Sequence, residues 1–106
     1  MTNLLTQELL TRFKEVGRQD VQNPLVIAKF FAPWNSWAWY AFSYNEETGT
    51  FFGLIKGSYK ELGYFAIEDL RGVRGPNGLR VERDLYFREK PLSEIQKPKR
   101  HLEPSL

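Results

Sequence analysis

Residues 37–44 constrain the fold most, because almost every residue in this segment is aromatic or small and apolar. Such a segment is typical of a strand, and alternate side chains of a strand point to opposite faces. One face would carry Trp37, Trp39 and Ala41, and the other Ala38, Tyr40 and Phe42. A single-layer sheet cannot bury both sets unless both of its faces are covered. The segment therefore predicts either a sheet with two covered faces or a sheet with one face left as a binding surface.

Strand-forming segments lie on both sides of this one. Residues 50–56 and 59–66 have strand character and are separated by turn residues, which predicts a three-stranded antiparallel meander with loops at 45–49 and 57–58. Residues 25–31 are β-branched and aromatic and predict a further strand at one edge of the meander. Residues 79–87 predict a last strand with its charges exposed.

Helical spacing occurs near both ends of the chain. Apolar residues in 7–16 recur at helical intervals, with Thr6 placed as an N-cap and Gly17 placed to end the helix. Shorter helices are predicted at 67–71 and at 91–95. The sequence therefore predicts an α+β fold, with an antiparallel, meander-type sheet of four to five strands, an N-terminal helix and one or two short helices.

The 106 residues match the usual size of one domain. We expect a single domain over residues 1–95 and a basic, flexible tail over 96–106, where two prolines interrupt a stretch with few apolar residues. Residues 1–87 hold ten Lys/Arg and ten Asp/Glu, so the net charge of +2 belongs to the end of the chain. The neutral body argues against nucleic-acid binding as the main function, and it also disfavours a strongly acidic DNA mimic.

Cysteine is absent, so disulfides, thiolate nucleophiles and cysteine-ligated metal centres are excluded. The residues after Met1 lack the basic stretch and long apolar run of a secretory signal. No apolar run approaches the ~20 residues needed to cross a bilayer. We expect a cytoplasmic protein without a membrane segment, a metal site or a cofactor.

Several blocks of sequence have a specific order and spacing. They include Lys29-Phe30-Phe31-Ala32-Pro33-Trp34-Asn35-Ser36-Trp37, Glu47-Thr48-Gly49, Glu61-Leu62-Gly63-Tyr64-Phe65, Arg74-Gly75-Pro76 and Val81-Glu82-Arg83-Asp84-Leu85-Tyr86-Phe87. On these blocks, the chain resembles a bacterial family known as domain of unknown function 2958. The resemblance covers about residues 4–95 and implies an accessory protein of plasmids, phages or integrative elements. It implies no reaction and no functional residues.

Two groups of residues are candidates for binding a partner. Trp34, Trp37 and Trp39, with Lys29 nearby, could form an exposed patch or a stacking platform for unpaired bases, although core packing is the simpler explanation. Trp34 lies in a turn, where it either folds back as a plug or is presented to a partner. The glycine-rich loop at 71–80 carries a second group, whose guanidinium groups and backbone amides could hold a phosphate. Its members are Arg71, Arg74 and Arg80.

Machinery for catalysis is hard to find in the sequence. Glu82 and Asp84 would share one side of a strand, where a surface ion pair with Arg71 or Arg74 is the default explanation. His101 is the single histidine and falls in the expected tail, where no triad or metal site could be held rigidly. We therefore expect a protein that is not an enzyme.

Three functions remain open. The favoured one is an accessory protein of a mobile element that binds a host or element protein through an exposed aromatic surface, with self-association also expected. The second is a module that binds single-stranded or structured DNA or RNA through aromatic residues and basic side chains. Its cations would be Lys29, Arg71, Arg74, Arg80, Lys97, Lys99 and Arg100. The third is a small enzyme with a carboxylate site that involves Asp69, Glu82 or Asp84.

Overall fold

The computed structural model describes residues 3–96 and contains a five-stranded antiparallel sheet in the order β5–β4–β3–β2–β6. The strands are β2 (Ala28–Phe31), β3 (Ala38–Asn45), β4 (Thr50–Lys56), β5 (Lys60–Ala66) and β6 (Glu82–Arg83). A separate antiparallel ladder joins β1 (Leu25–Val26) with β7 (Lys90–Pro91). The predicted α+β class and the β3–β4–β5 meander are confirmed. The part of the predicted tail at 97–106 lies outside the described residues.

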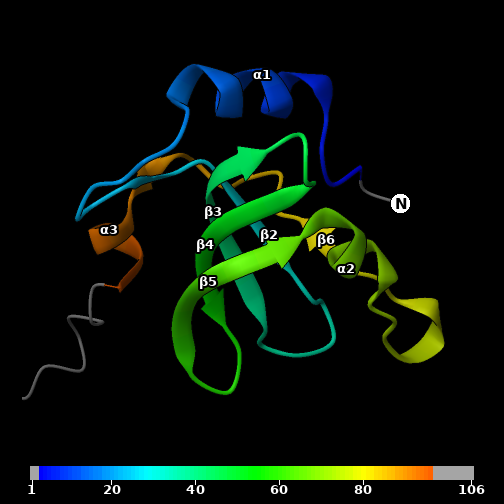
Figure 1. The fold of residues 1–106 in the computed structure, drawn as a ribbon. Coiled ribbons are helices and arrows are strands. Elements are labelled where there is room, and N and C mark those ends of the chain that lie inside the picture. The colour runs from blue at the N-terminus through cyan, green and yellow to red at the C-terminus, as the bar shows by residue number, and fades with distance from the viewer. Residues whose placement is uncertain (1–2, 97–106) are drawn as a thin grey trace, which may run out of the picture.

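Helices lie around the sheet on several sides. In the described residues they are α1 (Gln7–Val16), α2 (Ile67–Gly72), a short 3-10 turn η1 (Pro76–Gly78) and α3 (Leu92–Gln96). Figure 1 shows α1 lying across the upper end of the sheet, with α2 and α3 on opposite sides of it. The ends of α1 follow the sequence: Thr6 Oγ1 accepts a hydrogen bond from Leu9 N at 3.1 Å, and Gly17 ends the helix at φ 69°.

Two clusters of buried side chains lie on opposite faces of the sheet. The larger cluster joins Phe13 of α1 and Leu70 of α2 to Trp39 and Phe51 of the sheet. We call the face of the sheet on which this cluster lies the covered face. The smaller cluster holds the β3 side chains that point to the other face, packed with residues of β1, β4 and α3. We call this other face of the sheet the open face. Its buried members are Val26, Ala38, Tyr40, Phe42, Leu54 and Leu92. Both predicted faces of residues 37–44 are therefore apolar and in contact with other elements.

A bulge in β3 changes which side chains reach each face. The register of β3 against β4 shifts between Ala41 and Ser43, so Phe42 has no partner residue across the ladder. A bulge inserts one extra residue and reverses the alternation that follows it. Tyr44 therefore joins the covered face, where its ring lies 6.1 Å from Phe13 and 4.7 Å from Phe51.

Three predicted segments differ from the structure. The strand at 25–31 divides at Ile27 into β1 and β2, and β2 is an inner strand because β6 pairs on its free side. The strand at 79–87 shortens to β6, because Asp84 turns the chain by accepting hydrogen bonds from Tyr86 N and Phe87 N. The last helix begins at Leu92, since Pro91 belongs to β7.

An ion pair links α1 to the segment that precedes β7. Arg12 donates from Nε and Nη2 to the two carboxylate oxygens of Glu89, at 2.8 and 2.9 Å. These hydrogen bonds, with a further one to Glu15, raise the pKa of Arg12 above its ordinary value. The Arg12 side chain is about two-fifths exposed, so the pair orients the two segments more than it stabilises them.

The close approach of β3 and β4 at the bulge gives a direct stability test. A Cβ on Gly53 would collide with the carbonyl of Tyr40, which is backbone and cannot move aside. We expect Gly53→Ala to lower the free energy of unfolding by about 2 kcal/mol or more. Gly63→Ala is the matched control, because Gly63 pairs with Gly53 and its Cβ would meet only Ile55 Cδ1 at 3.6 Å. Urea unfolding measures both variants, and equal midpoints would contradict the proposed packing.

Candidate partner-binding surface

An aromatic row crosses the open face from the core to the sheet edge. Phe42 contacts Phe52 with ring centroids 5.9 Å apart, and Phe52 contacts Tyr64 at 4.8 Å. Phe52 is half-buried, whereas Tyr64 is 72% exposed. Leu62 lies on the same face of β5 and is 55% exposed. Phe52, Leu62 and Tyr64 thus form an apolar surface that we call the β5 patch.

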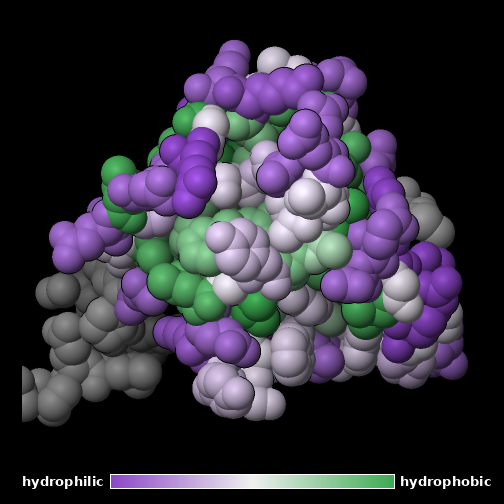
Figure 2. Space-filling model, in the orientation of Figure 1, coloured by the Kyte–Doolittle hydropathy of each residue, from purple (hydrophilic) through white to green (hydrophobic). Residues whose placement is uncertain are grey.

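The β5 patch follows from strand register. Leu62 is opposite Leu54 and Tyr64 is opposite Phe52 across the β4–β5 ladder. Cross-strand neighbours on one face touch, so the buried Leu54 and the half-buried Phe52 support the two exposed side chains. Figure 2 shows hydrophobic surface in the middle of the view, over the sheet, with hydrophilic side chains above it and to the right.

Two lysines extend the open face at the β4–β5 turn. Lys56 and Lys60 are opposite each other in the register, and both are exposed. They share the face of Leu54 and Leu62, because each lies two residues away from one of these leucines. The patch therefore has positive charge at one end, which favours a partner with carboxylate or phosphate groups nearby.

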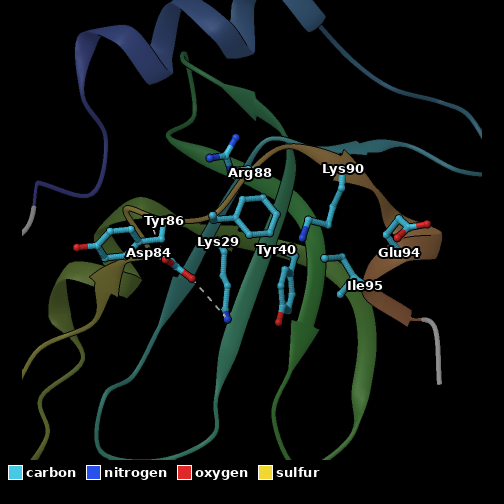
Figure 3. Close-up of a pocket in the computed structure, with 9 residues that line it drawn as sticks. Lys29, Tyr40, Asp84, Tyr86, Arg88, Lys90, Glu94 and Ile95 are labelled. Carbon is cyan, nitrogen blue, oxygen red and sulfur yellow. Dashed lines mark hydrogen bonds and ion pairs between the residues drawn. The ribbon is translucent and has the colours of Figure 1, made fainter. Parts of the chain in front are cut away.

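A cavity of about 400 Å³ opens between this face and the segment that leads into α3. Lys29 and Tyr40 lie side by side on β2 and β3 at one wall, while Tyr86 and Glu94 point outward (Figure 3). Lys29 Nζ is 3.8 Å from Asp84 Oδ2 and 5.6 Å from the centre of the Tyr40 ring. This ion pair compensates the charge of Lys29, so its ammonium is not a free anion site.

The tryptophans predicted as a partner patch occupy three different settings. Trp39 is 8% exposed and belongs to the larger core cluster. Trp34 is half-buried and folds back onto Gly75, which makes it a plug. Trp37 is 39% exposed and packs against Trp39 and Gly57. The three rings therefore do not form one exposed surface, and the sequence reasoning missed the β5 patch.

The predicted arginine loop folds onto a single carbonyl. Arg74 Nη1 and Arg80 Nη2 both donate to the carbonyl oxygen of Arg71, at 3.0 and 2.7 Å. Arg71 itself pairs with Glu68 at 2.7 Å. Within residues 3–96, Arg80 Nε is buried without a hydrogen-bond partner. This arginine cluster is built from α2 and the loop after it. Lys29 does not join it, because Lys29 lies against Asp84 on the open face.

The candidate acids lie in different settings. Asp84 pairs with Lys29 rather than with Arg71 or Arg74. Glu82 of β6 lies opposite Phe31 of β2, and Asp69 belongs to α2. Among the residues that the structure describes, no three His, Cys, Asp or Glu side chains come together to hold a metal ion. His101 lies outside the described part of the chain.

Comparison with known proteins places the chain in a family. Its residues 1–102 match the family model described as a protein of unknown function (DUF2958), and the chain belongs to that family. The resemblance seen in the sequence is thereby confirmed. No curated protein and no solved structure matches the chain. Over residues 3–96, none of the helices has the length and apolar character needed to span a membrane.

The plug role of Trp34 can be tested through Gly75. A methyl group on Gly75 would collide with the indole ring of Trp34. We expect Gly75→Ala to push the ring outward, shift tryptophan emission to longer wavelength and lower the free energy of unfolding by about 1–3 kcal/mol. Gly72→Ala is the control, because nothing lies within 4 Å of its Cβ position. A spectrum unchanged in both variants would contradict this contact.

Proposed function

We propose that this chain is a non-catalytic binding protein that docks a partner protein on the β5 patch. The observation that carries the proposal is the exposure of Leu62 and Tyr64, at 55% and 72%, beside the half-buried Phe52. Apolar and aromatic side chains gathered on one surface lose contact with water when a partner covers them, and this burial drives association. Tyrosine and other aromatic residues dominate the energetic centres of protein interfaces.

The sheet prepares this surface for binding. Tyr64 and Leu62 project from a strand whose seven residues pair with β4 without a register shift. Phe52 fills the space between Tyr64 and the core residue Phe42. Little backbone freedom remains to be lost on docking, so more of the contact energy appears as affinity.

The partner we propose has an apolar contact surface flanked by carboxylates. The apolar part would cover Leu62 and Tyr64, and the carboxylates would lie beside Lys56 and Lys60 at the end of the patch. In keeping with the resemblance described above, we propose that the partner is a host protein or a protein of the mobile element that carries the gene.

Single-stranded nucleic acid is a second candidate ligand of the same surface. An exposed aromatic ring with lysines on one sheet face is the arrangement on which unpaired bases stack. Tyr64, Lys56 and Lys60 supply these groups. The neutral charge of residues 1–87 and the presence of Leu62, which cannot stack with a base, favour the protein partner.

A cross-linking experiment tests the protein-binding proposal. A benzophenone amino acid replaces Leu62 in the native host cell, and irradiation captures whatever touches the patch. We expect one discrete product with a second protein, identified by mass spectrometry. Tyr64→Ser should remove it, because losing a central aromatic contact costs about 2 kcal/mol, or about 30-fold in affinity.

Tyr59→Ser is the matched control, since Tyr59 is also 72% exposed but lies in the β4–β5 turn. The product should survive this change. A product of twice the mass of the chain consists of two cross-linked copies of it and is not evidence for another protein partner. Absence of any other product, or equal loss in both variants, would contradict the proposal.

The nucleic-acid candidate has its own measurement. Fluorescence anisotropy with labelled single-stranded DNA and RNA, at low and at physiological salt, compares the full chain with a chain that ends at Gln96. We expect no binding by the shorter chain at physiological salt. Binding that persists there and is weakened by Tyr64→Ser but not by Tyr59→Ser would establish nucleic acid as the ligand instead.

A further inference from the structure

Among the residues that the structure describes, none pairs with the outer edge of the sheet at β5, and the hydrogen bonds around this edge show which backbone groups are free. β5 ends the strand order, so only one of its sides faces β4. Ile67 N donates to the Gly49 carbonyl at 2.9 Å, and Gly57 N donates to the Tyr59 carbonyl at 3.2 Å. Backbone groups alternate in direction along a strand. These two bonds therefore show that the backbone N–H and C=O groups of the odd-numbered residues of β5 face β4. The same groups of Lys60, Leu62, Tyr64 and Ala66 point outward, away from β4.

This edge lacks the features that usually prevent edge-to-edge pairing. Exposed edge strands are commonly short, bulged, or interrupted by proline or several charges. β5 has seven residues in uninterrupted register, contains no proline, and carries Lys60 as the single charge among its outward residues. The opposite edge strand, β6, has two residues. β5 is thus the stronger template for adding a strand.

We propose that β5 pairs with β5 of a second copy of this chain, antiparallel and with the two-fold axis at Gly63. In this register Leu62 of each copy is opposite Tyr64 of the other, so two identical apolar pairs form on the open face. All four outward residues of each strand then exchange backbone hydrogen bonds. The pairing joins two sheets into one and places the two β5 patches next to each other.

Other registers are less favourable. Moving the axis to Leu62 or Tyr64 leaves three outward residues paired on each strand instead of four. Moving it to Glu61 places the two Glu61 carboxylates directly opposite each other, where like charges repel. The self-complementarity of the Gly63 register is the reason for proposing a second copy rather than an unrelated peptide.

This inference goes beyond the proposed function, because it concerns the backbone edge of β5 and not the docking of another protein on the open face. The two proposals can therefore fail separately. The cross-linking of another protein at Leu62 tests the face, whereas a disulfide at Gly63 tests the edge.

The register places Gly63 opposite itself in a pair without hydrogen bonds, where Cα atoms lie about 4.5 Å apart and within the range of a disulfide. The chain has no cysteine, so Gly63→Cys introduces a single thiol. Its Cβ would meet only Ile55 Cδ1, at an ordinary 3.6 Å. We expect mild oxidation of the full chain to convert most of this variant to a disulfide-linked dimer, at least tenfold faster than Tyr86→Cys.

Tyr86 is the control because its side chain is 91% exposed and lies away from β5, so its thiol reacts by random collision. Sedimentation of the unmodified chain should show a dimer at the same concentrations. Equal oxidation rates for the two thiols, or a monomer at every concentration, would overturn the proposal.

A proline at Leu62 provides a second variant. The Leu62 N–H points outward, so proline there removes no hydrogen bond to β4 but removes two bonds across the two-fold axis. We expect Leu62→Pro to sediment as a monomer with an unchanged circular dichroism spectrum. Leu62→Ala keeps the N–H and should retain a weakened dimer. A dimer that survives the proline with full affinity would also overturn the proposal.

Discussion

β3 is apolar on both faces, and the rest of the fold depends on covering both of them. Trp39 and Ala41 need cover on one side, while Ala38, Tyr40 and Phe42 need it on the other. The two sides are covered unequally. α1 and α2 pack on the first, whereas the second is covered by β1 and by Leu92 of the short α3. This imbalance leaves apolar side chains exposed on the open face at β5.

The exposed side chains and the unpaired backbone of β5 have a common origin. Because the meander ends at β5 and the chain then turns into α2, no strand within residues 3–96 pairs with that edge. Leu62 and Tyr64 alternate with Phe65, which is buried on the covered face. The same strand thus supplies a core side chain, exposed apolar side chains and an edge of the sheet.

Much of the fold could be predicted from local patterns, because the Thr6 cap, the 45–49 turn and the aromatic alternation are short-range signals. The contacts that depend on distant residues could not. No local pattern indicates that Gly75 accommodates Trp34, or that Asp84 turns the chain to pair with Lys29. Of the tryptophans at 34–39, Trp39 lies in the core, Trp34 folds back as a plug, and Trp37 stays partly exposed against Trp39. The alternation of Leu62 and Tyr64 with Phe65 is visible in the sequence. That Leu62 and Tyr64 stay exposed could be inferred only by knowing that β5 is an edge strand.

Residue-resolved amide hydrogen exchange across β5, followed by NMR at low and at high protein concentration, tests the central claim most directly. If β5 is bonded on one side and takes a second strand on the other, Gly63 and Phe65 exchange slowly at both concentrations. Leu62 and Tyr64 exchange rapidly in the dilute protein and become protected as the concentration rises. Slow exchange at Leu62 and Tyr64 in the dilute monomer would show that the chain covers its own edge, and would contradict the account.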